Sequence, residues 1–216
     1  MRPEIAHLQD CLIRQGIRDP RILRAMREVP RPRFCRSEDL ARAWEDCELP
    51  LPGQSALPPA SLTKPSTLAA MLEALQLGPG DRVLELGTGS GYLTALLCEL
   101  SGSVRSLELC PERHSGARQR LDELGYSNAV LQHEDARRGS FDHAPWDAIV
   151  CTFALPYVPP PLLDQLAVGA RLLAAVGGSS KQELILYSAD DQGVHQEGAL
   201  FDVRFSSASG AKSNFL

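Results

Sequence analysis

The chain has 216 residues, of which 44% are hydrophobic, so it can bury a full core and most simply forms one domain. Its formal net charge is −5 and it carries no long basic stripe, which argues against recognition of nucleic acid through phosphates. No apolar run approaches the roughly 18 residues of a membrane span, and the start lacks the apolar core of a signal peptide. We therefore expect a cytoplasmic protein without a membrane or nucleic-acid partner.

The cysteines and histidines give no sign of a metal site. Six cysteines are scattered without a C-x-x-C pair, and five histidines occur without H-x-x-x-H spacing. Neither a zinc site nor a disulfide framework is indicated. The serines also lack the context of a nucleophile elbow, so we expect no metal and no covalent intermediate.

The first part of the chain predicts helix followed by a long irregular segment. Asp19 can cap a helix, Pro20 suits its first position, and apolar residues recur at helical spacing up to Val29. Residues 49–65 are rich in proline, which excludes a regular helix or a central strand. A long irregular stretch before a binding domain is often a lid or substrate loop.

After residue 80 the pattern alternates between strands and helices, which is typical of a parallel sheet with crossover helices. Helices are expected over 65–77, 92–100, 112–124 and 161–168. Strands are expected near 83–86, 104–108, 129–132, 147–151, 169–176 and 183–187. The fold class is therefore α/β, with a Rossmann-like, doubly wound, mostly parallel sheet and an N-terminal helical extension.

A glycine-rich loop, Gly87-Thr88-Gly89-Ser90-Gly91, joins the first of these strands to the helix that begins at Tyr92. Glycines let the backbone turn sharply and approach a ligand closely. The spacing differs from the G-x-G-x-x-G of pyrophosphate sites, and Glu85 just before the loop would repel phosphate and attract a cation. The loop resembles that of class I methyltransferases, which bind S-adenosylmethionine, a cationic cofactor without phosphate.

Acidic residues end the next two strands. Glu108 follows Gly87 at close to the roughly 20-residue spacing at which an acid meets ribose hydroxyls, and either Asp135 or Glu134 is placed to accept from the adenine amino group. We favour Asp135. The candidate cofactor-binding residues are Glu85, Gly87, Thr88, Gly89, Ser90, Gly91, Glu108, Leu109, Asp135, Ala136 and Thr152.

Motifs along most of the chain resemble protein-L-isoaspartate O-methyltransferases. They are Gly16-Ile17, Asp19, Arg21-Ile22-Leu23, Ala25-Met26, Val29-Pro30-Arg31, Phe34, Glu45-Asp46, Leu49-Pro50, 83–92, 146–152, Val158-Pro159, 162–166 and 169–177. The resemblance covers roughly residues 10 to 190. It implies a seven-stranded sheet, and methyl transfer from S-adenosylmethionine to a carboxylate of L-isoaspartyl residues in damaged proteins. It also implies one methyltransferase domain, with 1–65 as extension and substrate loop and 66–216 as the cofactor-binding core. We expect a monomer.

The resemblance also points to the methyl-transfer site. The family has a loop of the type T-I-S-Q-P, and Ser61-Leu62-Thr63-Lys64-Pro65 aligns with it, which places Thr63 on the active serine and Ser61 on the threonine. Residues 54–59 resemble the same loop in a second register. The alternative role of Thr63 is to cap the helix that follows.

Two segments depart from the family pattern. Lys64 replaces a glutamine, and Val203-Arg204-Phe205 resembles the start of the family's V-x-F-V-P-L strand but continues as Ser206-Ser207-Ala208. Three alternatives therefore stand beside isoaspartyl methylation. They are the same fold with another acceptor, such as a small carboxylate or a nucleophile on RNA or protein, a non-catalytic S-adenosylmethionine-binding module and, remotely, a nicotinamide dehydrogenase.

Overall fold

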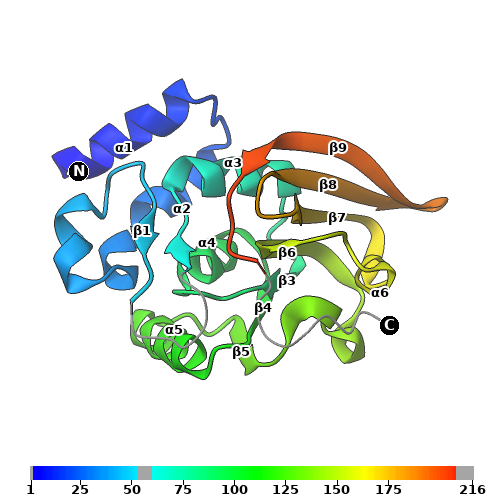
Figure 1. The fold of residues 1–216 in the computed structure, drawn as a ribbon. Helices are drawn as coiled ribbons and strands as arrows, with labels where there is room; N and C mark the ends of the chain where they lie inside the picture. Colours follow the sequence, from blue (N-terminus) through cyan, green and yellow to red (C-terminus); the bar gives the residue numbers. More distant parts are fainter. Residues whose placement is uncertain (1, 53–59, 208–216) are drawn as a thin grey trace.

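A computed structural model describes residues 2–52 and 60–207 of the chain, and Figure 1 shows its fold. Helices α1 (Pro3–Arg14) and α2 (Pro20–Glu28) come first, followed by the 3-10 turns η1 (Arg31–Phe34) and η2 (Ser37–Arg42). The predicted start of α2 is confirmed: Pro20 is its first residue, and the Asp19 carboxylate accepts from the Arg21 N–H at 2.8 Å. Helix α1, which the sequence analysis did not predict individually, packs on α2 and α3 (Pro65–Leu75).

The central sheet has seven strands in the order β5-β4-β3-β6-β7-β8-β9. The bounds of the strands and of the helices between them are β3 (Arg82–Leu86), α4 (Tyr92–Leu100), β4 (Ser103–Glu108), α5 (Pro111–Leu124), β5 (Ala129–His133), η3 (Ala136–Arg138), η4 (Phe141–His143), β6 (Trp146–Leu155), α6 (Pro160–Leu163), β7 (Leu166–Gly177), β8 (Gln182–Asp190) and β9 (Gly193–Val203). The first five strands in that order pair in parallel, and β8 is antiparallel to both of its neighbours. The expected Rossmann-like, mostly parallel fold is confirmed.

Apolar side chains on both faces of the sheet form the core. Along β3, Val83 belongs to the cluster that packs under the N-terminal helices, whereas Leu84 and Leu86 belong to a second cluster on the opposite face. This alternation follows from the two-residue period of a strand. Because both faces of β3 are buried, its sequence is a nearly continuous apolar run, which leaves Glu85 as the exception.

The expected helix over 161–168 is wrong in its second half. Helix α6 ends at Leu163, and β7 already begins at Leu166, which pairs with Trp146 on β6. The apolar spacing of this segment fits a helix as well as a strand, since short apolar runs do not separate the two. The buried Gln165 side chain holds the turn between α6 and β7 in place. It donates to the carbonyl oxygens of Arg138 and Pro161, both at 2.8 Å, and its Oε1 accepts from the Ser140 N–H.

The seventh strand of the sheet, β9, was not located from the sequence. Strand β9 ends at Val203, where the segment that resembles the family's V-x-F strand begins, and it pairs with β8 along its length with two register shifts. Figure 1 shows the chain leaving the end of β9 and turning back toward the centre of the sheet. There Ser207 forms an isolated bridge with Ala154, and the Ala154 N–H donates to the Ser206 carbonyl at 2.9 Å.

The described ends of the proline-rich segment, residues 49–52 and 60–65, lie outside the central sheet, as expected. Its two ends pair with each other in a short antiparallel ladder, β1 (Leu49–Pro50) with β2 (Ser61–Leu62). Residues 54–59, the second register considered for the substrate loop, lie outside the described residues. The ladder leads directly into α3, whose first residue is Pro65.

Candidate active site

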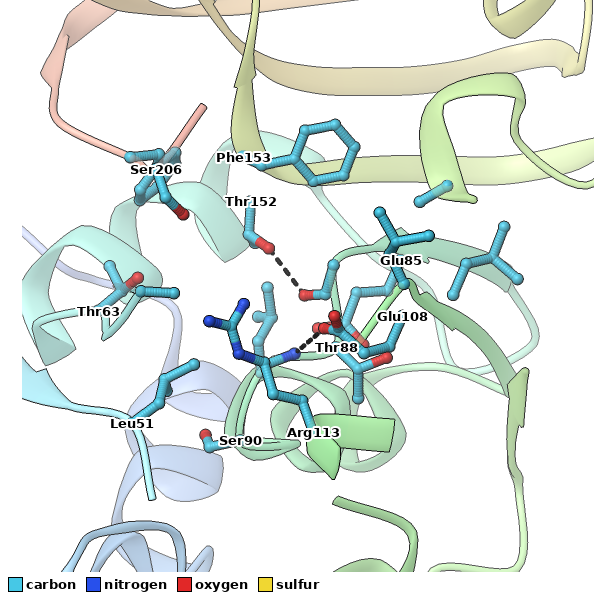
Figure 2. A pocket seen from close by; sticks show the side chains of 18 of the residues that line it. Leu51, Thr63, Glu85, Thr88, Ser90, Glu108, Arg113, Thr152, Phe153 and Ser206 are labelled. Carbon is cyan, nitrogen blue, oxygen red and sulfur yellow. Dashed lines mark hydrogen bonds between the residues drawn. The ribbon is translucent and has the colours of Figure 1, made fainter. Parts of the chain in front are cut away.

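A cavity lies at the carboxyl ends of β3, β4, β5 and β6, the edge where open parallel sheets bind ligands. It holds about 1020 Å³ of empty space including its open mouth, which suits a nucleoside-sized molecule together with part of a second one. Figure 2 shows Glu85, Thr88 and Glu108 on one side, Thr63 and Ser206 on the other, and Arg113 reaching into the space between them.

No helix among the described residues is long and apolar enough to cross a membrane.

The glycine loop brings the backbone into this cavity. Gly87 has φ +98°, and a Cβ there would come within 2.8 Å of the Thr152 hydroxyl, which donates to the Gly87 carbonyl at 2.8 Å. A side chain at this position would therefore strain the backbone and displace the Thr152 hydroxyl from the Gly87 carbonyl. Gly87, Thr88, Gly89, Ser90 and Thr152 all line the cavity. Gly91 does not line the cavity. It is the N-cap of α4, and a Cβ added at Gly91 would meet Ala117 of α5 at 3.2 Å.

Glu85 is fully buried in the wall of the cavity. Thr94 and Ser106 donate their hydroxyls to its Oε2 at 2.5 and 2.6 Å, and Thr88 bonds Ser106 in turn at 2.5 Å. Its other oxygen, Oε1, is buried and has no hydrogen-bond partner among the described residues. Burial raises the pKa of Glu85 to about 8, against the lowering effect of the two hydroxyls. A buried acceptor left over in a cavity wall fits a cationic or N–H-bearing ligand.

Glu108 is held with its carboxylate against the glycine loop. Its Oε2 accepts from the Gly89 N–H and its Oε1 from the Cys110 N–H, both at 2.9 Å. Only 6% of the residue is exposed. Each carboxylate oxygen can accept a further hydrogen bond, so the group can receive a pair of vicinal hydroxyls while the backbone fixes its orientation.

Of the two acids considered for the adenine end, Asp135 lines the cavity and Glu134 does not. The Asp135 carboxylate accepts from Arg137 Nε at 2.9 Å and caps the turn η3. The Arg137 guanidinium therefore holds the pKa of Asp135 below its usual range, and the group stays ionised at neutral pH. Leu109 and Ala136, the other two candidates on this side, also line the cavity.

The two candidate methyl-transfer residues, Ser61 of β2 and Thr63 just after it, both line the cavity. Thr63 is 8% exposed, and its backbone carbonyl accepts from Arg31 Nη2 at 3.3 Å. The cap of α3 is Lys64, without a side-chain bond, so Thr63 does not cap that helix. Ser61 donates its hydroxyl to Glu48 at 3.2 Å, on the more exposed side of the ladder.

Several lining residues were not singled out from the sequence. Arg113 belongs to α5, Phe153 to β6 and Leu51 to the segment after β1, whereas Phe205, Ser206 and Ser207 come from the chain that returns after β9. Only the departure at 203–208 drew attention to any of them. A buried arginine, Arg31, also braces the site: its guanidinium donates to four backbone carbonyls, those of Ala43, Glu45, Cys47 and Thr63.

Comparison with known proteins agrees with this geometry. The family model described as "Protein-L-isoaspartate(D-aspartate) O-methyltransferase (PCMT)" matches residues 4–213. A protein-L-isoaspartate O-methyltransferase 2 of Pelobacter propionicus is 43% identical over 206 residues, which cover 95% of this chain and 89% of that protein. A protein-L-isoaspartate O-methyltransferase of Synechococcus sp. is 45% identical, covering 90% of this chain and 80% of that one.

Solved structures show the same fold. One protein-L-isoaspartate O-methyltransferase superposes with a TM-score of 0.86 at 27% identity, covering 95% of this chain and 66% of that longer one. A Plasmodium falciparum structure in complex with S-adenosyl-L-homocysteine has a TM-score of 0.78 at 23% identity, which supports the fold alone. The sheet, the glycine loop and the acids at its edge define a class I S-adenosylmethionine-dependent methyltransferase. Within that class, the chain belongs to the protein-L-isoaspartate(D-aspartate) O-methyltransferase family.

Proposed function

We propose that this protein transfers a methyl group from S-adenosylmethionine to a carboxylate of L-isoaspartyl residues in damaged proteins. The observation that carries the proposal is the buried Oε1 of Glu85, which has no hydrogen-bond partner in the part of the chain that the structure describes, in the wall of a cavity that Thr63 also lines. One cavity thus offers a carboxylate for the cationic methyl donor and, on the opposite side, Thr63 beside the space for the methyl acceptor (Figure 2). We call the opening of the cavity beside Thr63 the acceptor mouth. Relatives named for this activity, 43% and 45% identical, support the same assignment.

The described residues fit S-adenosylmethionine. Glu85 lines the cavity and its buried Oε1 has no hydrogen-bond partner among the described residues, Glu108 is oriented for ribose hydroxyls, and Asp135 lines the cavity together with Leu109 and Ala136. Gly87 allows the positive-φ turn that carries the loop past Thr152 and Phe153, with which a Cβ would collide. The cofactor supplies an electrophilic methyl group and leaves as a neutral thioether.

The protein's task at the acceptor is alignment. A carboxylate is already ionised at neutral pH, so no general base is required. The chain must hold one carboxylate oxygen in line with the methyl group and exclude water. Thr63 and Ser61 come from one wall and Phe205 to Ser207 from another, so the acceptor would lie between the substrate loop and the returning chain. We assign the aligning hydroxyl to Thr63 or Ser61.

The location of the protein in the cell, its oligomeric state and its partners are further predictions. We propose a cytoplasmic monomer, organised as one methyltransferase domain, that acts on isoaspartyl proteins without nucleic-acid or membrane partners. The net charge of −5 supports the absence of a nucleic-acid partner. Sedimentation of the purified protein would test the monomer directly.

The test combines binding with turnover in one preparation. S-adenosylmethionine is titrated by calorimetry, and labelled methyl transfer is then measured to an isoaspartyl peptide and to its normal aspartyl twin. Binding with transfer to the isoaspartyl peptide alone is the expected result. Binding without transfer to either peptide would overturn the proposed acceptor and favour another one, for which the polar Ser206 and Ser207 in the cavity wall already provide a reason. Absence of binding would overturn the cofactor assignment as well.

A further inference from the structure

A second cavity lies beside the acceptor mouth, on the other side of the chain that returns from β9. It holds about 820 Å³ of empty space, again including open solvent. Phe205 lines both cavities, and Thr63 lines the first where its neighbour Lys64 lines the second. The two hollows therefore meet along one short stretch of β2–α3 backbone and one stretch of returning chain. We call the second hollow the flanking groove; it is lined by Glu48, Lys64, Thr67, Ser179, Ser180, Lys181, Gln182, Asp202, Val203, Arg204 and Phe205.

The wall between the cavities is fixed in place. Gln182 is buried, and its side-chain amide accepts from the Phe205 N–H at 2.7 Å and donates to the Phe205 carbonyl at 3.0 Å. On the far side, the Ser206 carbonyl is held by the Ala154 N–H. The position of the flanking groove relative to the acceptor mouth is thus set by the Gln182 side chain on one side of the wall and by a backbone hydrogen bond on the other.

The charged side chains of the flanking groove differ in whether they form ion pairs with other residues. Lys181 forms an ion pair with Glu183 at 2.8 Å, and the negative charge of Asp202 also acts on it. The positive charge of Lys181 is therefore largely compensated. Glu48 accepts from Ser61. Within residues 2–52 and 60–207, no ion pair is formed by Lys64 or Arg204. The charge of Lys64 does act on Asp46, which itself is bonded to Ser66 and Gln15.

We propose that the flanking groove binds an acidic side chain of the substrate protein, within three residues of the methylated isoaspartyl residue, through Lys64 and Arg204. The inference rests on the proposed function, since it adds a second contact to the same acceptor. A peptide whose carboxylate enters the first cavity past Thr63 meets Lys64 next along the same wall. Because Lys64 and Arg204 form no ion pair with the residues that the structure describes, they favour a carboxylate there over a neutral or basic side chain.

The test uses matched isoaspartyl peptides that carry Glu, Gln or Lys at one of the three positions on either side of the acceptor. At the best position we expect kcat/KM for the Glu peptide to exceed that for the Gln peptide by about two- to five-fold, as for exposed ion pairs, with the Lys peptide lowest. The ratio should shrink as salt is added. Binding of the same peptides in the presence of S-adenosyl-L-homocysteine, followed by fluorescence anisotropy, reads the preference without turnover.

Substitutions of Lys64 and Arg204 test whether these two residues cause the preference for the Glu peptide. Lys64→Gln and Arg204→Gln should each lower the Glu-to-Gln ratio, and the double variant should bring it to about one. Arg14→Gln, an exposed arginine of α1 outside both cavities, should leave the ratio unchanged. Equal kcat/KM for the Glu and Gln peptides at every position, or a preference that survives in the double variant, would overturn the inference while the proposed function stands. Transfer to none of the isoaspartyl peptides would instead overturn the proposed function, and this inference with it.

Discussion

The side-chain amide of Gln182 is bonded to both backbone polar groups of Phe205, so one buried residue of β8 fixes the chain that returns to the cavity. Gln182→Leu would leave the N–H and the carbonyl of Phe205 buried without partners, at a local cost of about 1–3 kcal/mol each. The wall of the acceptor mouth would then loosen. We expect KM for an isoaspartyl peptide to rise about ten-fold, with the dissociation constant of S-adenosylmethionine little changed.

Gln192→Leu, in the exposed turn between β8 and β9, is the matched control and should alter neither constant. Steady-state kinetics with the peptide and calorimetry with the cofactor separate the two quantities. Equal losses in peptide KM and cofactor affinity would show that Gln182 supports the whole fold rather than the acceptor wall.

Cofactor affinity should depend on the protonation of Glu85. Because the pKa of Glu85 is about 8, the carboxyl is mostly protonated at pH 7 in the free protein, and a cationic ligand favours the ionised form. Binding at pH 7 should therefore release close to one proton, and the association constant should rise with pH up to about 8 and then level off. Calorimetry in buffers of different ionisation enthalpy measures the released proton.

Glu85→Gln provides the control for that experiment, since it keeps an oxygen to accept from Thr94 and Ser106. The variant should bind S-adenosylmethionine more weakly and lose the pH dependence that comes from the protein, leaving only that of the ligand. Persistence of the same proton release in the variant would assign it to another group.

Glu108→Gln should weaken cofactor binding strongly. The carboxylate accepts from two backbone N–H groups, and an amide would turn an NH₂ toward one of them. Loss of a charge-assisted hydrogen bond of about 1.5–3 kcal/mol corresponds to a rise of about 10- to 150-fold in the dissociation constant. Glu112→Gln, on the exposed first turn of α5, should have little effect in the same titration. Similar losses in both variants would contradict a specific role for Glu108.

Thr63 and Ser61 should differ in their effect on turnover. The Thr63 residue is nearly buried at the cavity wall, whereas the Ser61 hydroxyl already donates to Glu48 on the more exposed side. Thr63→Val keeps the shape and removes the hydroxyl; we expect kcat to fall about 10- to 100-fold, as when a hydrogen bond to a charged group is lost, with cofactor affinity retained. Ser61→Ala should lower kcat by less than three-fold. The opposite order in single-turnover assays would move the aligning role to Ser61.

Arg31→Met should destabilise the fold. Its guanidinium is fully buried, bonds four backbone carbonyls and lies over the ring of Tyr92 at 5.8 Å. Leaving these carbonyls without a donor should cost about 3 kcal/mol or more, which lowers Tm by about 6–12 °C in a chain of this size. Arg33→Met removes only an exposed ion pair with Glu123 and should change Tm by less than about 3 °C. Scanning calorimetry compares the two variants, and equal shifts would contradict the role given to Arg31.

The sequence by itself determined the features that local chemistry controls. The apolar run of β3, the alternate glycines and the start of α4 at Tyr92 follow one another in the chain, so their residue types are enough to predict a strand, a tight turn and a helix. The position of Glu108 followed from the regular length of one strand–helix–strand unit. These features gave the fold class and the glycine-loop side of the cavity.

Only the tertiary structure decided what depends on partners distant in sequence. The segment after Leu163 became a strand because β6 offered it a pairing edge and Gln165 fixed the turn, although its apolar spacing suited a helix equally well. Arg31 under Thr63, and Gln182 on Phe205, are joined across 32 and 23 positions by bonds to backbone groups. Every residue type except proline presents the same backbone N–H and carbonyl groups, so the pattern of side chains along the chain does not specify such contacts in advance.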